Sequence, residues 1–279
     1  MLKIASLLNI LIYIYPSIVN AFSINPYISS HHTLTALKSS SSSYSAQAEL
    51  LLKKADLVRI GEDTKFGINA NKGVRREAES IIESLVSSKE RDYSLTSCIG
   101  KWTLIYTDAP DITSLDRTPT SSLGRVGQEV ISAGGPSDSQ KGSYEVRNVI
   151  EWLRPKWAGR LPLPDRVKGW VIGGEPSEGS TGGRVIQKVI TRGSDREGSG
   201  GTVDLKIEGA QVYAEGNSKG LPLLLQRVKD KPIDLKGPGG ALPFGSFEIM
   251  YLDEGMRIIK TSNGNWAVNL KDDAGSEWF

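Results

Sequence analysis

The sequence predicts a mainly β fold, an antiparallel β-barrel preceded by a pair of α-helices. From Lys101 onward the apolar residues recur with a period of two, and short segments of this kind are separated by turn signals. The composition agrees, because 30 glycines and 13 prolines favour a turn-rich chain over a helical bundle. A chain of 279 residues with 38% hydrophobic content is also long enough to bury a sizeable core.

The first 48 residues have the composition of a targeting leader. Lys3, an apolar run at 4–15 and small residues up to Ala21 follow the plan of a secretory signal peptide at 1–21. The run is shorter than an ordinary membrane span of about 20 residues, and an uncleaved anchor is the alternative. Residues 22–48 are rich in serine and threonine and contain no acidic residue, as in a transit peptide, so we expect them to be disordered. A secreted protein with a serine-rich tail is the alternative for this segment.

Two helices are predicted within residues 46–89. In "AQAELLLKKADLVRI" and in "VRREAESIIESLVSSK" the apolar residues recur at spacings of three and four. Asn71 lies three residues before Val74, where it can cap the second helix. We expect a helical hairpin packed on the barrel; the alternative is an apolar stripe that adheres to a lipid surface.

About ten short strands are predicted within the barrel region, residues 98–271. "KWTLIYT" places Trp102, Leu104 and Tyr106 on one face, and "SYEVRNVIEW" alternates in the same way through Ile150. Further strands are expected at "RVGQEVIS", "RVKGWVI", "RVIQKVITR", "TVDLKIE", "QVYAE", "SFEIMYL", "MRIIK" and "NWAVNL". A closed barrel is favoured over a sandwich, because closure removes exposed strand edges and encloses a ligand-sized interior.

Several connections between these strands are rich in glycine. No Walker pattern and no βαβ unit surrounds them, so a phosphate-binding loop is not expected, and most of them fit solvated loops. The segment 235–245 also contains Leu242, Pro243 and Phe244, which supports the hypothesis of a lid over a cavity mouth.

The composition excludes several classes of function. His31 and His32 are the two histidines, and both lie in the segment expected to be removed, which excludes a Ser/His/Asp triad, a Cys/His dyad and a His-ligated metal. Cys98 is the single cysteine, so we expect a structural thiol and neither a disulfide nor a zinc site. Without Lys3 and Lys38, 32 basic residues balance 32 acidic ones, and no nucleic-acid partner is expected. We therefore expect no enzymatic activity, no metal and no cofactor.

The stretch "YLDEGMRII" predicts two strands joined at "DEG". Gly255 would provide the permissive backbone of a tight turn, and the carboxylate of Asp253 would accept backbone N–H bonds. Arg257 is expected to pair with Asp253 or Glu254 across the hairpin, at the barrel rim.

An apolar ligand is the expected occupant of the barrel, because neutral, aromatic-rich inner walls suit such a ligand. A dry core is the alternative for each aromatic side chain. The candidate barrel-lining or rim residues are Trp102, Leu104, Tyr106, Ile150, Trp152, Tyr251, Asp253, Arg257 and Trp266.

The segments "CIGKWTLIYTDAPDITSL", "GRVGQEV", "NVIEW" and "YLDEGMRIIKTSNGNWAVNLK" occur in this order, after the helical stretch "KFGINANKGVRREAESIIESL". Together they resemble the plastid lipid-associated protein family, the plastid fibrillins, over residues 49–271. The resemblance implies a lipocalin-like barrel at 49–279 with no established catalytic residue. The aspartate near the family's C-terminus and the arginine that follows it correspond to Asp253 and Arg257.

The resemblance also implies a function and a location. The expected function is binding, transport or organisation of apolar plastid lipids, namely quinones, carotenoids or acyl lipids, at thylakoids or plastoglobules. The alternative is a coat or scaffold of plastid lipid bodies that docks lipid-biosynthetic enzymes. The leader resembles the bipartite signal of a secondary plastid, which implies import into the chloroplast through the endoplasmic reticulum.

Overall fold

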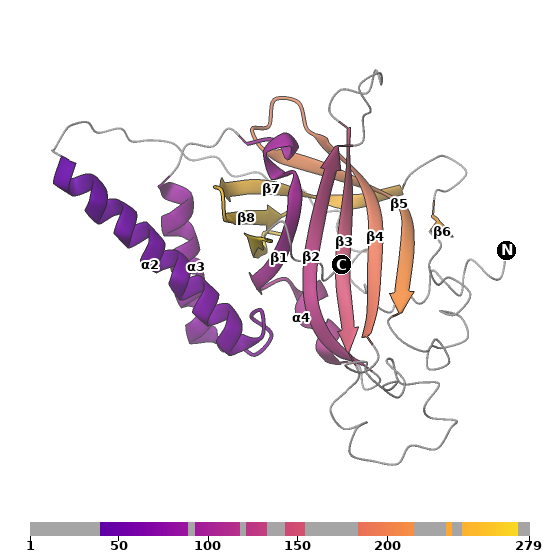
Figure 1. Cartoon of the computed structure of the whole chain (residues 1–279), viewed down its shortest axis with the longest axis horizontal. Helices are drawn as coiled ribbons and strands as arrows, with labels where there is room; N and C mark the ends of the chain where they lie inside the picture. Colours follow the sequence, from indigo (N-terminus) through magenta and orange to yellow (C-terminus); the bar gives the residue numbers. More distant parts are fainter. Residues whose placement is uncertain are drawn as a thin grey trace, which may run out of the picture.

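Two α-helices precede a nine-stranded antiparallel sheet in the computed structural model (Figure 1). The structure describes residues 40–88, 93–117, 121–132, 143–153, 184–214, 233–235 and 242–272. The predicted signal peptide, the segment 22–39 and the predicted strand "RVKGWVI" lie outside these residues.

The two helices are α2, Ser40–Thr64, and α3, Lys72–Ser87. Helix α2 begins inside the segment predicted as a transit peptide. The predicted cap of α3 is confirmed, because the Asn71 side chain accepts hydrogen bonds from the backbone N–H groups of Gly73 and Val74 at 2.9 and 3.0 Å. In Figure 1 the two helices lie side by side, next to β1, β7 and β8.

The described strands form a ring of antiparallel pairs. Their order is β4-β3-β2-β1-β9-β8-β7-β5-β6, and β4 also pairs with β5, so the sheet closes on itself and leaves β6 outside the ring. The predicted strands "TVDLKIE" and "QVYAE" are parts of the single strand β5. The bounds are β1 Gly100–Thr107, β2 Ser122–Ser132, β3 Ser143–Leu153, β4 Arg184–Asp195, β5 Thr202–Ala214, β6 Ile233–Asp234, β7 Leu242–Leu252, β8 Met256–Thr261 and β9 Trp266–Lys271. Short helical turns η1 Leu95–Cys98, α4 Pro110–Thr113 and η2 Leu115–Arg117 flank β1 and β2.

The lid hypothesis for residues 235–245 fails for its last four residues. Residues 242–245 are the beginning of β7 and are paired with β5. A strand held on one side by ladder hydrogen bonds is not free to open and close as a loop would be.

A β-bulge in β1 corrects the predicted face of one aromatic residue. The pairing with β9 shifts between Leu104 and Tyr106, so that Ile105 and Tyr106 both face the helices and Thr107 returns to the interior of the ring. The expectation that Tyr106 shares the face of Trp102 and Leu104 is therefore wrong. The sequence pattern alone assumes an unbroken alternation, which a bulge interrupts by one residue.

A second bulge in β7 has the same effect. The pairing with β8 shifts between Ile249 and Tyr251, and Met250 and Tyr251 both belong to the core under the helices. Ile249 and Leu252, on either side, belong to the cluster inside the ring.

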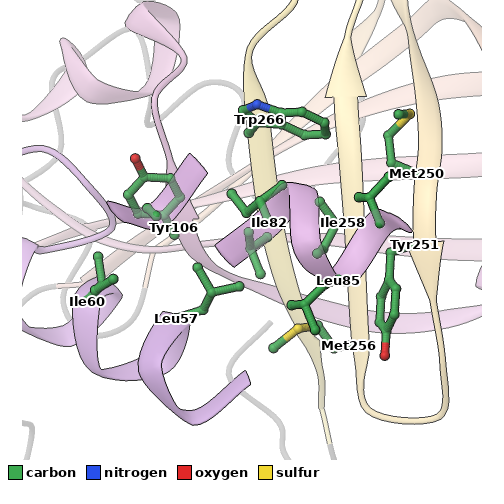
Figure 2. Close-up of a cluster of buried hydrophobic side chains, with 13 residues drawn as sticks. Leu57, Ile60, Ile82, Leu85, Tyr106, Met250, Tyr251, Met256, Ile258 and Trp266 are labelled. Atoms are coloured by element: carbon green, nitrogen blue, oxygen red, sulfur yellow. The ribbon is translucent and has the colours of Figure 1, made fainter. Parts of the chain in front are cut away.

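The helices pack on the outer face of β1, β9, β8 and β7, as predicted. Figure 2 shows Leu57, Ile60, Ile82 and Leu85 of the helices facing the strand side chains, and all of these residues are buried. Removing this apolar surface from water stabilises the fold at about 25 cal/mol per Å². The strand side chains of this helix–sheet core are Tyr106, Met250, Tyr251, Met256, Ile258, Trp266 and Val268.

Two glycines let the end of α2 and the turn after it lie against the backbone of β1. A Cβ on Gly61 would lie 2.1 Å from the carbonyl oxygen of Ile105, and a Cβ on Gly67 would lie 2.2 Å from that of Thr107. Gly67 also has a φ of +91°, and the Thr107 N–H donates to the Phe66 carbonyl at 2.9 Å. The helical hairpin is thus docked on the strand backbone as well as through side chains.

Candidate ligand-binding cavity

A cavity of about 560 Å³ lies inside the ring. This volume falls within the range of about 300–1,000 Å³ that is usual for small-molecule sites. Phe244 and Ala267 contact both of the apolar clusters inside the ring, so the cavity lies between those clusters. The apolar side chains of the wall are Leu104, Ala109, Ile112, Val126, Leu205, Pro243, Phe244, Phe247, Ile259 and Ala267.

The cavity has an exposed mouth, and Arg257 and Asn269 lie buried at the end of the β8–β9 pair that is away from the turn between these strands. At the mouth lie the exposed residues Lys206, Pro243, Gly245, Ser262 and Asn263. The buried polar side chains of the lining are Thr107, Gln128, Arg257 and Asn269.

Arg257 is the most unusual residue of the lining. Its side chain is fully buried, and its Nε, Nη1 and Nη2 atoms have no hydrogen-bond partner among the described residues. The guanidinium carbon lies 4.8 Å from the centre of the Trp102 ring, which gives it a cation–π contact. The predicted pairing with Asp253 or Glu254 is wrong, because Arg257 and its cross-strand neighbour Leu252 point into the ring.

The thiol of Cys98 is the titratable group that acts on Arg257, through a side-chain contact and through its charge. Burial raises the pKa of this thiol, and the opposing influence of Arg257 is smaller, so the thiol is neutral at pH 7. Burial lowers the pKa of Arg257, but a guanidinium remains a cation at neutral pH. The structure confirms Cys98 as a buried thiol, and this thiol does not supply the negative charge that Arg257 lacks.

Two amide side chains on β2 and β3 also line the cavity. The Gln128 Nε2 group donates to Asn148 Oδ1 at 2.9 Å, whereas Gln128 Oε1 and Asn148 Nδ2 are buried and have no partner among the described residues. Gln128 on β2 lies opposite Trp102 on β1, and the Trp102 ring contacts the Arg257 guanidinium. The two amides are therefore on the strands next to this contact. A bound polar group would satisfy them.

Two carboxylates also line the cavity. Burial raises the pKa of Asp111 in α4, and Asp204 in β5 is paired with Arg196 at 3.1 Å between Oδ2 and Nε. Neither forms an ion pair with Arg257 within the part of the chain that the structure describes. The buried cation of the lining, Arg257, therefore has no carboxylate counter-ion among the described residues.

Asp253 lies on the helix side of the sheet, away from the cavity. Its carboxylate accepts hydrogen bonds from the Lys54 ammonium group, from the Tyr251 hydroxyl at 2.5 Å and from the N–H groups of Gly255 and Met256 at 3.0 and 2.8 Å. Burial alone would raise its pKa, but these hydrogen bonds outweigh burial and lower the pKa to about 2. The turn role predicted for Asp253 is confirmed. The special backbone predicted for Gly255 is not needed, since its φ is not positive.

The structure separates the predicted site residues into three groups. Leu104 and Arg257 line the cavity, and Trp102 lies beside Arg257. Ile150 and Trp152 belong to one of the interior clusters, and the Trp152 indole N–H donates to Gln187 at 3.1 Å. Tyr106, Tyr251 and Trp266 belong to the helix–sheet core, and Asp253 ties that hairpin to α2.

Sequence reasoning missed several residues of the lining, namely Gln128, Asn148, Phe247, Ala267 and Asn269. A signal was present for the amides: Asn148 lies on the inward face of a strand that is otherwise apolar through Ile150. A polar residue at such a position is expected to have a buried partner.

The described residues contain no group of three or more His, Cys, Asp or Glu side chains placed to hold a metal ion. None of the described helices is both long and apolar enough to cross a membrane. Residues 52–166 match the PAP_fibrillin family model, which covers most of α2 and extends through β3. No curated protein and no solved structure matched the chain.

Proposed function

We propose that the chain, whose residues 52–166 match the PAP_fibrillin family model, binds apolar plastid lipids inside its ring of strands without catalysing a reaction. The family is one of plastid lipid-associated proteins that are generally structural rather than enzymatic. In the proposed role the protein carries or organises quinones, carotenoids or acyl lipids.

The observation that carries this proposal is the cavity of about 560 Å³ with its largely apolar wall. Each Å² of apolar ligand surface removed from water contributes about 25 cal/mol, so a prenyl or acyl tail gains affinity from burial alone. The exposed mouth at Pro243 and Asn263 gives such a tail a route from solvent or from a lipid surface.

Titration with a neutral apolar fluorophore such as diphenylhexatriene tests lipid binding. We expect saturable binding to the wild type and at least a tenfold weaker affinity for Ala267→Phe, whose ring would occupy the cavity. Ala267→Ser changes the volume little and should bind as the wild type does. A wild type that binds neither the probe nor an added quinone or carotenoid, and that carries no lipid by mass spectrometry after gentle isolation, contradicts the proposal.

The proposed place of action is the plastid, at thylakoids or plastoglobules, reached through a bipartite signal. The family of residues 52–166 and the composition of residues 1–48 support this location. A fluorescent protein fused behind residues 1–48 should enter the plastid of an alga with a secondary plastid. Secretion of the fusion, or its retention in the endoplasmic reticulum, contradicts the assignment.

A coat or scaffold function on lipid bodies is the second candidate. Leu51 and Leu52 of α2 are 59% and 67% exposed and favour surface contact, whereas most of the helical apolar stripe is buried against the sheet. Flotation with lipid droplets separates the two functions. The scaffold function requires that Leu51→Ser with Leu52→Ser abolishes flotation while probe binding is retained.

A further inference from the structure

We propose that the ligand of the cavity is a single-tailed lipid with an anionic head group, a carboxylate, that pairs with Arg257 at the buried end while its tail extends toward the mouth. This inference rests on the proposed lipid binding and narrows it from apolar lipids in general to acidic ones.

The buried Arg257 guanidinium has no counter-charge among the described residues. Arg257 is fully buried and none of its three guanidinium nitrogens has a hydrogen-bond partner in the described part of the chain. A buried charge is costly unless it is paired and hydrogen-bonded, and the cation–π contact with Trp102 leaves the N–H donors unsatisfied. An anion from outside the chain would satisfy them, and Arg257 lines a cavity that such an anion can enter.

The donors at the buried end of the cavity determine which head group fits there. The planar fork of a guanidinium matches a carboxylate in a bidentate geometry. The Asn148 Nδ2 group, which has no partner among the described residues, adds a donor from another strand of the same cavity. The buried Asn269 Nδ2 group makes one long hydrogen bond, 3.5 Å to the Ala267 carbonyl, and its second N–H is a further donor. These groups favour a small, planar oxyanion.

The distribution of apolar and acidic side chains along the cavity favours one orientation of the ligand. The wall between the buried end and the mouth is mainly apolar, which suits a hydrocarbon tail. Asp111 and Asp204 also line the cavity, away from any pairing with Arg257, and carboxylates repel an anionic head group. The head group is therefore favoured beside Arg257 and the tail beside Phe244 and Ala267.

Parinaric acid and its methyl ester test the inference, because the two fluorescent probes share one tail and differ in head-group charge. For the wild-type chain we expect at least tenfold tighter binding of the acid than of the ester at pH 7.5. Arg257→Met should weaken binding of the acid to the level of the ester and leave the ester unchanged, whereas Arg257→Lys should retain part of the preference. Arg59→Met, which removes an exposed arginine of α2, is the matched control and should bind both probes as the wild type does.

The outcomes separate this inference from the proposed function. Equal affinity of the wild type for acid and ester overturns the anion site and leaves lipid binding standing. No binding of either overturns the anion site, and it overturns lipid binding as well only if diphenylhexatriene, quinone and carotenoid also fail to bind and no lipid is carried by the isolated protein. This comparison needs no variant, so it holds even if Arg257→Met fails to fold. Displacement of the bound acid by a monoalkyl phosphate more strongly than by a fatty acid of equal chain length overturns the carboxylate as the head group.

Discussion

Asp253 and Arg257 belong to one hairpin, but their charged groups lie on opposite faces of the sheet. Asp253 faces α2 and accepts a hydrogen bond from Lys54, whereas Arg257 lies inside the ring over the Trp102 ring. The hairpin thus carries one charge that is satisfied by the fold and one that is not. The two residues should respond differently to mutation.

Asp253→Ala is expected to lower the free energy of unfolding by about 3 kcal/mol. The change removes the acceptor of four hydrogen bonds, two of them from the backbone of the turn, and leaves Lys54 without its partner. Asp253→Asn keeps an acceptor for the Gly255 and Met256 N–H groups and should lose about half as much. Urea denaturation measures both values, and equal losses would contradict the turn role.

Asp253 also predicts an acid-sensitive step in stability. Its pKa is lowered from 3.8 to about 2 in the folded chain, so its contribution is complete above the unfolded value and is lost as the pH falls from about 4 to about 2. After allowance for partial solvent contact, the contribution is about 1–2 kcal/mol. Denaturation of wild type and Asp253→Asn at pH 2, 3, 4 and 6 should give curves that converge at the acid end. A constant difference would contradict the assignment.

Arg257→Met is expected to stabilise the ligand-free protein. Methionine has a similar length, and it removes a buried cation that has no hydrogen-bond partner among the described residues. The free energy of unfolding in urea should rise by about 1 kcal/mol or more. A loss of 1 kcal/mol or more would instead mean that the charge is already satisfied in the ligand-free chain.

Gly61→Ala is expected to destabilise the docking of α2 by about 2 kcal/mol or more. The added methyl group would lie 2.1 Å from the Ile105 carbonyl oxygen, and two backbones would have to move apart. Gly255→Ala is the control, since an added methyl group there would meet nothing within 4 Å and the φ of Gly255 is not positive. That control should be neutral or stabilising by up to about 1 kcal/mol, because alanine reduces the freedom of the unfolded chain. Thermal unfolding of both variants provides the comparison.

The sequence predicted most of the elements, because each depends on a local pattern. The periodicities of α3 and of β7, β8 and β9 are visible in their own residues, and so is the Asn71 cap. The pairing of β1 with β9 joins Trp102 to Lys271, at opposite ends of the strand region, and no local pattern determines such a partner. Closure was therefore inferred from the general cost of open edges.

The faces of the aromatic residues were harder to predict, because a bulge changes them without changing composition. Tyr106 and Tyr251 were expected along the cavity and lie in the helix–sheet core. Arg257 was predicted as a site residue, but the predicted partners were Asp253 and Glu254, the carboxylates nearest to it along the chain. Of those carboxylates, Asp253 faces α2 on the other side of the sheet, and Glu254 is exposed in the turn.

The two bulges increase the apolar surface that the strands around the cavity present to the helical hairpin. Each bulge presents two consecutive apolar side chains to the helices, Ile105 with Tyr106 and Met250 with Tyr251, on strands whose other face encloses the interior of the ring. A chain shortened to the strands alone would therefore present this double row to water and aggregate along it. We therefore expect the ring that holds the cavity and the helical hairpin packed on it to unfold together.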